Sequence, residues 1–109
     1  MSGRSGGGSG AELEFAWDPV KATSNLAKHG VAFAEAANVF ADPLALTVFD
    51  AAHSEFEERW FTLGMAGASK LLAVSHTFTA TGPATARVRI ISAREATRSE
   101  RRQYENNPR

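Results

Sequence analysis

Three histidines are the side chains of this sequence best suited to proton transfer. They are His29, His53 and His76, and a histidine can take up or release a proton near neutral pH. His53 lies in a turn at residues 50–55, where functional groups often concentrate. The alternative to a catalytic role for His29 is that it is a half-buried residue at the end of a helix. His76 lies inside a predicted strand, and the alternative to a catalytic role is that its side chain is packed in the core with one hydrogen bond.

Arginines on predicted strands form the second group. Arg59, Arg87 and Arg89 could project together from a sheet, where guanidinium groups suit two-point contacts with phosphate. An acidic cluster precedes Arg59 and comprises Glu55, Glu57 and Glu58. The alternative is cross-strand ion pairing between these arginines and the acidic cluster.

Together these residue types fit one chemistry. Cleavage of RNA without a metal requires deprotonation of a 2′-hydroxyl, protonation of a leaving oxygen and stabilisation of a phosphorane-like charge. Histidine, glutamate, lysine and arginine can do all three. Composition does not distinguish such a nuclease from a protein that merely binds RNA.

Other chemistries find little support in the sequence. The histidines have no metal-ligand spacing, and there is no phosphate-binding loop, dinucleotide fingerprint or nucleophile elbow, so we expect no metal and no cofactor. The absence of cysteine excludes disulfides and thiolate sites and fits a cytoplasmic protein. No apolar run is long enough to span a bilayer and the N-terminus lacks a signal region, so no membrane association is expected.

The length and charge of the chain limit the kind of domain that can position these residues. The chain has 109 residues, 43% of them hydrophobic, and a formal net charge of zero. Seven arginines but only three glutamates follow position 86, so the C-terminal part is basic. Residues 1–13 are interpreted as a flexible Gly/Ser-rich tail or an added linker, 14–106 as a single domain and 107–109 as a C-terminal tail.

Local signals predict an α+β fold. Residues 14–17 could form a short strand, and Asp18 and Pro19 open a helix that Gly30 ends. A second helix is predicted at 33–40. An antiparallel β-meander of about four strands follows at 44–49, 59–65, 71–79 and 86–92. Ser92 and Glu95 match a capping box, which predicts a C-terminal helix over 93–106 with a stripe of arginines.

Ordered motifs along nearly the whole of 15–105 resemble the BrnT family of toxins from type II toxin–antitoxin systems. The motifs are the residues 15–22, 25, 28–31 and 33–36, then 42–43, 53–54, 57–59 and 63–64, then 71–74 and 76–77, and finally 89–94, 96–97, 100–101 and 104–105. One departure is Thr79, because an arginine often follows the His-Thr pair in this family. That departure leaves weak activity as an alternative.

The resemblance implies a small ribonuclease with a RelE-like fold that cleaves RNA and restrains translation and growth. It also implies neutralisation by a ribbon-helix-helix antitoxin in a hetero-oligomer, which contacts operator DNA through the antitoxin. The carried-over catalytic candidates are Glu58, Arg59, His76, Arg89 and Arg94. The RNA-binding candidates are Lys21, Lys28, His29, His53, Arg87 and Arg101.

Two alternatives stand beside a ribonuclease toxin. One is a catalytically weak or inactive homologue that acts as an antitoxin-binding module. The other is a protein that places its C-terminal helix in the DNA major groove. The neutral net charge and the lack of a helix-turn-helix pattern disfavour the second.

Overall fold

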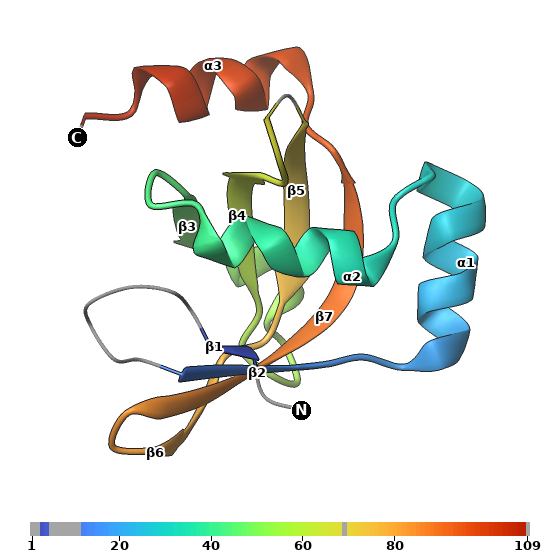
Figure 1. Ribbon diagram of the computed structural model, residues 1–109, viewed down its shortest axis with the longest axis vertical. Helices are drawn as coiled ribbons and strands as arrows, with labels where there is room; N and C mark the ends of the chain where they lie inside the picture. Colours follow the sequence, from blue (N-terminus) through green and yellow to red (C-terminus); the bar gives the residue numbers. More distant parts are fainter. Residues whose placement is uncertain (1–2, 5–11, 69, 109) are drawn as a thin grey trace.

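The computed structural model describes residues 3–4, 12–68 and 70–108. Its strands form one mixed sheet in the order β1-β2-β7-β5-β4-β3, with β6 also paired to β7 (Figure 1). The strands are β1 (Gly3–Arg4), β2 (Glu12–Ala16), β3 (Leu46–Phe49), β4 (Trp60–Met65), β5 (Leu71–His76), β6 (Thr79–Gly82) and β7 (Thr85–Glu95). The helical segments are α1 (Pro19–His29), α2 (Phe33–Ala36), η1 (Ala37–Ala41), η2 (Ala51–His53) and α3 (Arg98–Asn106).

The α+β class and the meander of β3, β4, β5 and β7 are as predicted, but the sheet is not purely antiparallel. Strand β2 runs parallel to β7, with Phe15 opposite Val88. Most of the predicted tail at 1–13 lies outside the described residues, and β2 begins inside it, at Glu12. The expected second helix is α-helical for four residues only and continues as the 3₁₀ segment η1.

Helix α1 confirms its local signals. The Asp18 side chain accepts a hydrogen bond from the Val20 amide, Pro19 occupies the first turn, and Gly30 adopts a left-handed φ of 71° after the last turn. Buried Asn25 joins α1 to the sheet: its side chain donates to the carbonyls of Val31 and Ala93 and accepts from the Ala93 amide. This fixes α1 beside β7 (Figure 1).

The predicted start of the C-terminal helix is wrong. Ser92 and Glu95 lie in β7, where they pair with β5, so backbone pairing replaces the capping box expected there. The capping box actually used is Thr97 with Glu100, and α3 begins at Arg98. Arg94 is therefore a strand residue. Helix α3 is held through buried Tyr104, and the Tyr104 hydroxyl donates to Asp42.

Two hydrophobic layers leave part of the sheet uncovered. On one face α2 and η1 cover a core that includes Val74, Val88 and Ile90. On the other face Tyr104 of α3 packs with Leu63, Leu71 and Ala73 at one end of the strands (Figure 1). The remainder of that second face carries the candidate site.

Candidate functional site

A bulge in β7 places its arginines on one face of the sheet. Ser92 is opposite Ser75 and Ile90 is opposite His76, so Ile91 is an extra residue between them. Side chains alternate along a strand, and one extra residue reverses the alternation. Val88, Ile90 and Ala93 therefore all face the same core. Arg87, Arg89 and Arg94 consequently point to the opposite face.

The first cleft on this face has a volume of about 370 Å³ and is called the His53 cleft here. It is lined by Asp50, His53, Arg59, Phe61, Ser75, Ile91, Ser92 and Arg94. Three residues singled out in the sequence thus converge in it: His53, Arg59 and Arg94. They come from η2, from the residue preceding β4, and from β7, so the sheet and one loop assemble the cleft.

His53 forms a pair with Asp50. The His53 Nδ1 atom lies 2.9 Å from one Asp50 carboxylate oxygen and 3.1 Å from the other. An ionised carboxylate only accepts, so Nδ1 carries a proton, and in the neutral form of the ring Nε2 is then the acceptor. The loop is closed by the Ser54 hydroxyl, which donates to the Asp50 carbonyl and accepts from the Arg59 amide. Sequence reasoning missed Asp50, although its spacing of three residues from His53 within one turn could have indicated it.

Arg94 is fixed by a two-point ion pair with Glu100. Its Nη1 and Nη2 atoms donate to the two Glu100 oxygens at 2.8 and 2.9 Å. The Arg94 hydrogen bonds, together with the Thr97 amide, lower the pKa of Glu100 to about 2 against the desolvation that opposes this. The guanidinium carbon also lies 5.8 Å from the centre of the Phe61 ring. Arg94 is thus held in one orientation at the wall of the cleft.

Arg59 is less fully paired. Its Nε atom is buried and has no hydrogen-bond partner among the described residues. The nearest carboxylate contact is with Glu57, at 4.0 Å. Its side chain is one third exposed. Arg59 therefore offers donors to an anionic group that enters the His53 cleft.

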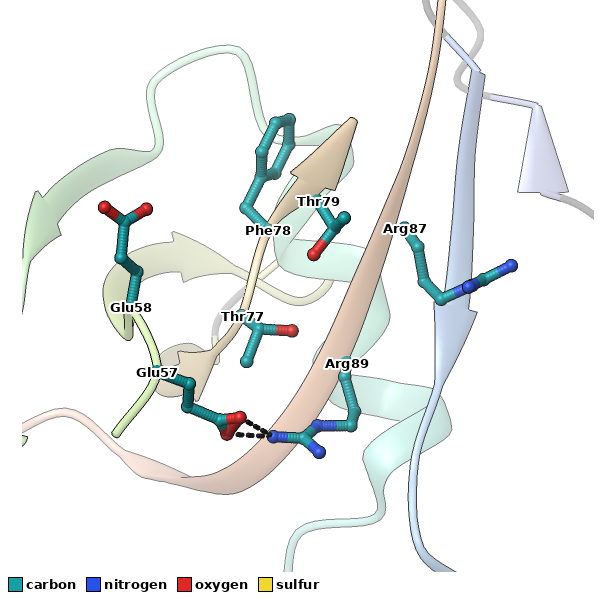
Figure 2. Close-up of a pocket in the computed structure, with 7 residues that line it drawn as sticks. All are labelled: Glu57, Glu58, Thr77, Phe78, Thr79, Arg87 and Arg89. Carbon is teal, nitrogen blue, oxygen red and sulfur yellow. Dashed lines mark hydrogen bonds and ion pairs between the residues drawn. The ribbon is translucent and has the colours of Figure 1, made fainter. Parts of the chain in front are cut away.

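A second cleft, called the Phe78 cleft here, adjoins the first and has a volume of about 410 Å³ (Figure 2). It is lined by Glu57, Glu58, Thr77, Phe78, Thr79, Arg87 and Arg89. Arg89 donates from Nη2 to both oxygens of Glu57, and Arg87 pairs with Glu14 at 3.2 Å. Glu57 therefore lies between Arg89 of this cleft and Arg59 of the His53 cleft. The cross-strand ion pairing considered as an alternative is present for Arg89.

His76 is buried and lines neither the His53 cleft nor the Phe78 cleft, but it borders a separate, mainly apolar cavity of about 360 Å³ together with Phe40, Thr47, Trp60 and Phe78. It is 2% exposed, its Nε2 atom lies 2.7 Å from the Thr62 hydroxyl, and its Nδ1 atom lies 2.9 Å from the Thr77 carbonyl. Both ring nitrogens are therefore engaged, with Nδ1 as donor to the carbonyl. The His76 ring also packs edge-on against the Phe40 ring, with 4.8 Å between the two ring centroids. This arrangement matches the packed histidine weighed as an alternative.

Burial of His76 predicts a pH dependence of stability. Desolvation lowers the pKa of His76 below the ordinary histidine value of 6.5, although the hydrogen bond to the Thr77 carbonyl acts in the opposite direction. A histidine whose pKa is lowered by folding contributes its full stability above pH 6.5 and loses it as the pH falls below that value. We expect the free energy of unfolding, measured in urea, to fall by up to about 1 kcal/mol from pH 7.5 to 5.5. The His76→Gln variant should lose this slope and His53→Gln, at an exposed site, should keep it; equal slopes in both variants would contradict the prediction.

The remaining candidates lie on exposed helix surfaces. Lys21, Lys28 and His29 are exposed on α1, so His29 is not half-buried as considered. Arg101 on α3 pairs with Glu105 at 3.8 Å. None of the four lines the His53 cleft or the Phe78 cleft.

Two broader properties concern the described residues only. Within them, no three His, Cys, Asp or Glu side chains are grouped so as to hold a metal ion. No helix formed by them has the length and apolar character needed to cross a membrane.

Comparisons with known proteins agree with one another. A profile of the family described as "Ribonuclease toxin, BrnT, of type II toxin-antitoxin system" matches residues 17–100. The fold is similar to that of the Brucella abortus ribonuclease toxin BrnT in its 1.1 Å crystal structure, with a TM-score of 0.55 and 26% sequence identity. The alignment covers 77% of this chain and 96% of that one. No curated protein matches the chain.

Proposed function

This chain belongs to the BrnT family of ribonuclease toxins of type II toxin–antitoxin systems, and from this premise we propose that it is an endoribonuclease whose active site is the His53 cleft. The observation that carries the proposal is the convergence of the His53–Asp50 pair with Arg59 and Arg94 in one cleft. These side chains supply acid–base and charge-stabilising groups. The proposed reaction therefore requires no metal.

In the proposed reaction His53 is the general base. Its unprotonated Nε2 takes the proton of a ribose 2′-hydroxyl, and the 2′-oxygen attacks the adjacent phosphorus. The bond from phosphorus to the 5′-oxygen breaks, and that oxygen takes up a proton from water, while His53 returns the proton it accepted to the solvent. The products are a 2′,3′-cyclic phosphate and a 5′-hydroxyl. Asp50 keeps the imidazole in the required tautomer and orientation.

Arg59 and Arg94 are proposed to stabilise the negative charge that builds on the phosphate oxygens. Fixed donors are effective because they need no rearrangement during the reaction. The Glu100 pair and the Phe61 ring hold Arg94 in such a fixed position. Glu58 and Arg89 line the adjoining cleft and are therefore assigned to substrate binding.

At the level of the cell, we propose that RNA cleavage inhibits translation and growth in the cytoplasm. Neutralisation is proposed to occur in a hetero-oligomer with a ribbon-helix-helix antitoxin, which would also make the contact with operator DNA. The basis of these proposals is the family to which the chain belongs and the sequence motifs that it shares with that family. The RelE-like fold class remains an expectation of the same kind.

A cleavage assay tests the proposal. We expect the purified chain to cut a labelled single-stranded RNA at equal rates with and without a chelator, and we expect the 5′ fragment to end in a 2′,3′-cyclic phosphate, detected by mass spectrometry. Because the proposed reaction uses only the side chains of His53, Arg59 and Arg94, removal of divalent ions should change the rate of cleavage by less than twofold.

Two results would count against the proposal. Loss of cutting in chelator, restored by Mg²⁺, would place a metal in the reaction. Intact RNA with folded protein, together with a normal growth curve on expression of the chain alone, would favour the inactive antitoxin-binding module. Steeply salt-dependent binding of duplex DNA by the isolated chain would instead favour direct DNA binding.

A further inference from the structure

The Phe78 cleft adjoins the proposed active site and has no role in the reaction described above. Both clefts open on the face of β7 that carries Arg87, Arg89 and Arg94. Glu57 contacts Arg89 in one cleft and Arg59 in the other. An RNA strand continues on both sides of the bond that is cut, so a nucleotide next to the scissile phosphate would lie over the Phe78 cleft.

We propose that the Phe78 cleft binds a guanine base of the RNA next to the scissile phosphate; this inference rests on the proposed function. The volume of about 410 Å³ is within the range of about 300 to 1,000 Å³ typical of small-molecule pockets. The lining combines an aromatic ring, a carboxylate, two hydroxyls and arginine donors.

Phe78 provides a surface on which a base can stack. Its side chain is 50% exposed although it is large and apolar. Proteins that bind single-stranded nucleic acids stack bases on exposed aromatic rings, which contributes about 1–3 kcal/mol per base. Figure 2 shows the Phe78 ring and the Glu58 side chain extending in the same direction from the wall of the cleft. A base stacked on the ring would therefore present its edge toward the carboxylate.

Glu58 determines which base fits. It is exposed and has no ion-pair partner among the described residues, unlike Glu57, which pairs with Arg89. An ionised carboxylate only accepts hydrogen bonds. Guanine presents two adjacent donors, N1–H and the N2 amino group, which match the two carboxylate oxygens. On adenine, cytosine and uracil an acceptor stands beside the donor and would face the carboxylate.

Arg89 completes the subsite. Among the described residues it contacts Glu57 through Nη2, so Nε and Nη1 remain as donors, and its side chain is 46% exposed. These donors suit a phosphate of the bound strand or the O6 and N7 acceptors of guanine. Glu57 fixes the position of Arg89 and links base binding to the neighbouring Arg59.

The test uses RNA pentamers that are uridine except at the centre, where they carry guanine, inosine, adenine or cytosine. A 2′-fluoro group replaces each 2′-hydroxyl so that the strands bind but cannot be cut. Fluorescence anisotropy with the full chain should give a Kd about tenfold lower for guanine than for adenine or cytosine. Inosine, which lacks the N2 amino group, should fall between them.

Paired variants assign the preference to the cleft. Glu58→Gln should reduce the guanine advantage to less than twofold, while Glu55→Gln, at an exposed residue outside the cleft, should keep it. Phe78→Ala should weaken binding of all four pentamers by about tenfold. Phe56→Ala removes a ring that is 93% exposed and lies outside the cleft, and it should leave the binding of all four pentamers unchanged.

Cutting of the matching 2′-hydroxyl pentamers separates this inference from the proposed function. Equal affinity for the four bases in a protein that cuts RNA would overturn the guanine subsite and leave the ribonuclease assignment intact. A guanine preference in a protein that cuts none of them would support the subsite and overturn that assignment. If Glu58→Gln abolished cutting of every pentamer but left the guanine preference unchanged, Glu58 would act in the reaction and the subsite would be wrong.

Discussion

Replacement of His53 by alanine is expected to lower the rate constant for RNA cleavage by about 10²- to 10⁴-fold, the range for loss of a general acid or base. The imidazole is the proposed proton acceptor in the cleft, because its Nδ1 is bound to Asp50 and its Nε2 has no hydrogen-bond partner among the described residues. The side chain is 69% exposed, so the substitution should leave the fold intact. Single-turnover cleavage of a labelled RNA, with circular dichroism as a check of folding, measures the effect.

Matched variants make the result specific to the His53–Asp50 pair. Asp50→Asn should cause a smaller loss, because the ring stays in place but its tautomer is no longer fixed. Glu55→Gln, at an exposed residue that lines neither cleft, should cleave at the parent rate. A folded His53→Ala protein that cleaves as fast as the parent would move the acid–base role to another residue.

The largest expected effect on stability comes from Asn25→Ala, at about 3 kcal/mol or more. Asn25 is 7% exposed and its side chain forms three hydrogen bonds, at 3.0 Å to the Val31 carbonyl and at 2.8 and 3.1 Å to the carbonyl and amide of Ala93. Alanine would leave these backbone groups buried without partners, each at a cost of about 1–3 kcal/mol. The total is a large part of the ~5–15 kcal/mol that stabilises a typical domain.

Urea unfolding followed by tryptophan fluorescence measures this loss. The neighbouring Ser24→Ala is the control, because Ser24 is exposed on the same helix and alanine favours helix formation. Its unfolding free energy should stay within about 0.5 kcal/mol of the parent value. A change of less than 1 kcal/mol in Asn25→Ala would show that α1 is held to β7 by other contacts.

The features predicted correctly from the sequence are those with local causes. Helix α1 begins after Asp18, at Pro19, and ends before Gly30, because capping and backbone geometry act within a few residues. The meander strands follow from runs of β-branched and apolar residues. Errors occurred where distant segments decide the outcome. Ser92 and Glu95 satisfy a capping pattern as well as Thr97 and Glu100 do, but pairing with β5 keeps the first two residues in a strand.

Two other features of the sheet were not predicted from the sequence. The parallel pairing of β2 with β7 joins residues more than 70 positions apart, such as Glu14 and Arg87, and no periodicity encodes it. The sequence predicts one strand over 71–79, but β5 ends at His76, and β6 begins at Thr79 and folds back on the start of β7, which offers it an edge to pair with. Local propensity is a weak guide where an available edge can be paired.

The candidate site was predicted in its residue types but not in its grouping. His53, Arg59 and Arg94 were chosen separately, and a loop closed by Ser54 together with the bulge at Ile91 brings them into one cleft. The partner of Arg94, Glu100, comes from α3, so spacing in the sequence could not identify it, whereas the pairing of Arg89 with Glu57 was considered from the sequence as an alternative. His76 illustrates the converse, since its position in a strand fits both a core and a functional role until burial is known.

The position of β7 also bears on when the proposed active site forms during synthesis of the chain. Strand β7 lies between β2 and β5 in the sheet and binds α1, yet it is the last strand to emerge from the ribosome, from Thr85 onward. A nascent chain that ends before it lacks the surface on which its other parts assemble, and it lacks Arg94. Contacts of such long sequence separation form late in folding. RNA cleavage is therefore expected only from chains that include β7, and chains truncated before Thr85 are expected to leave RNA intact.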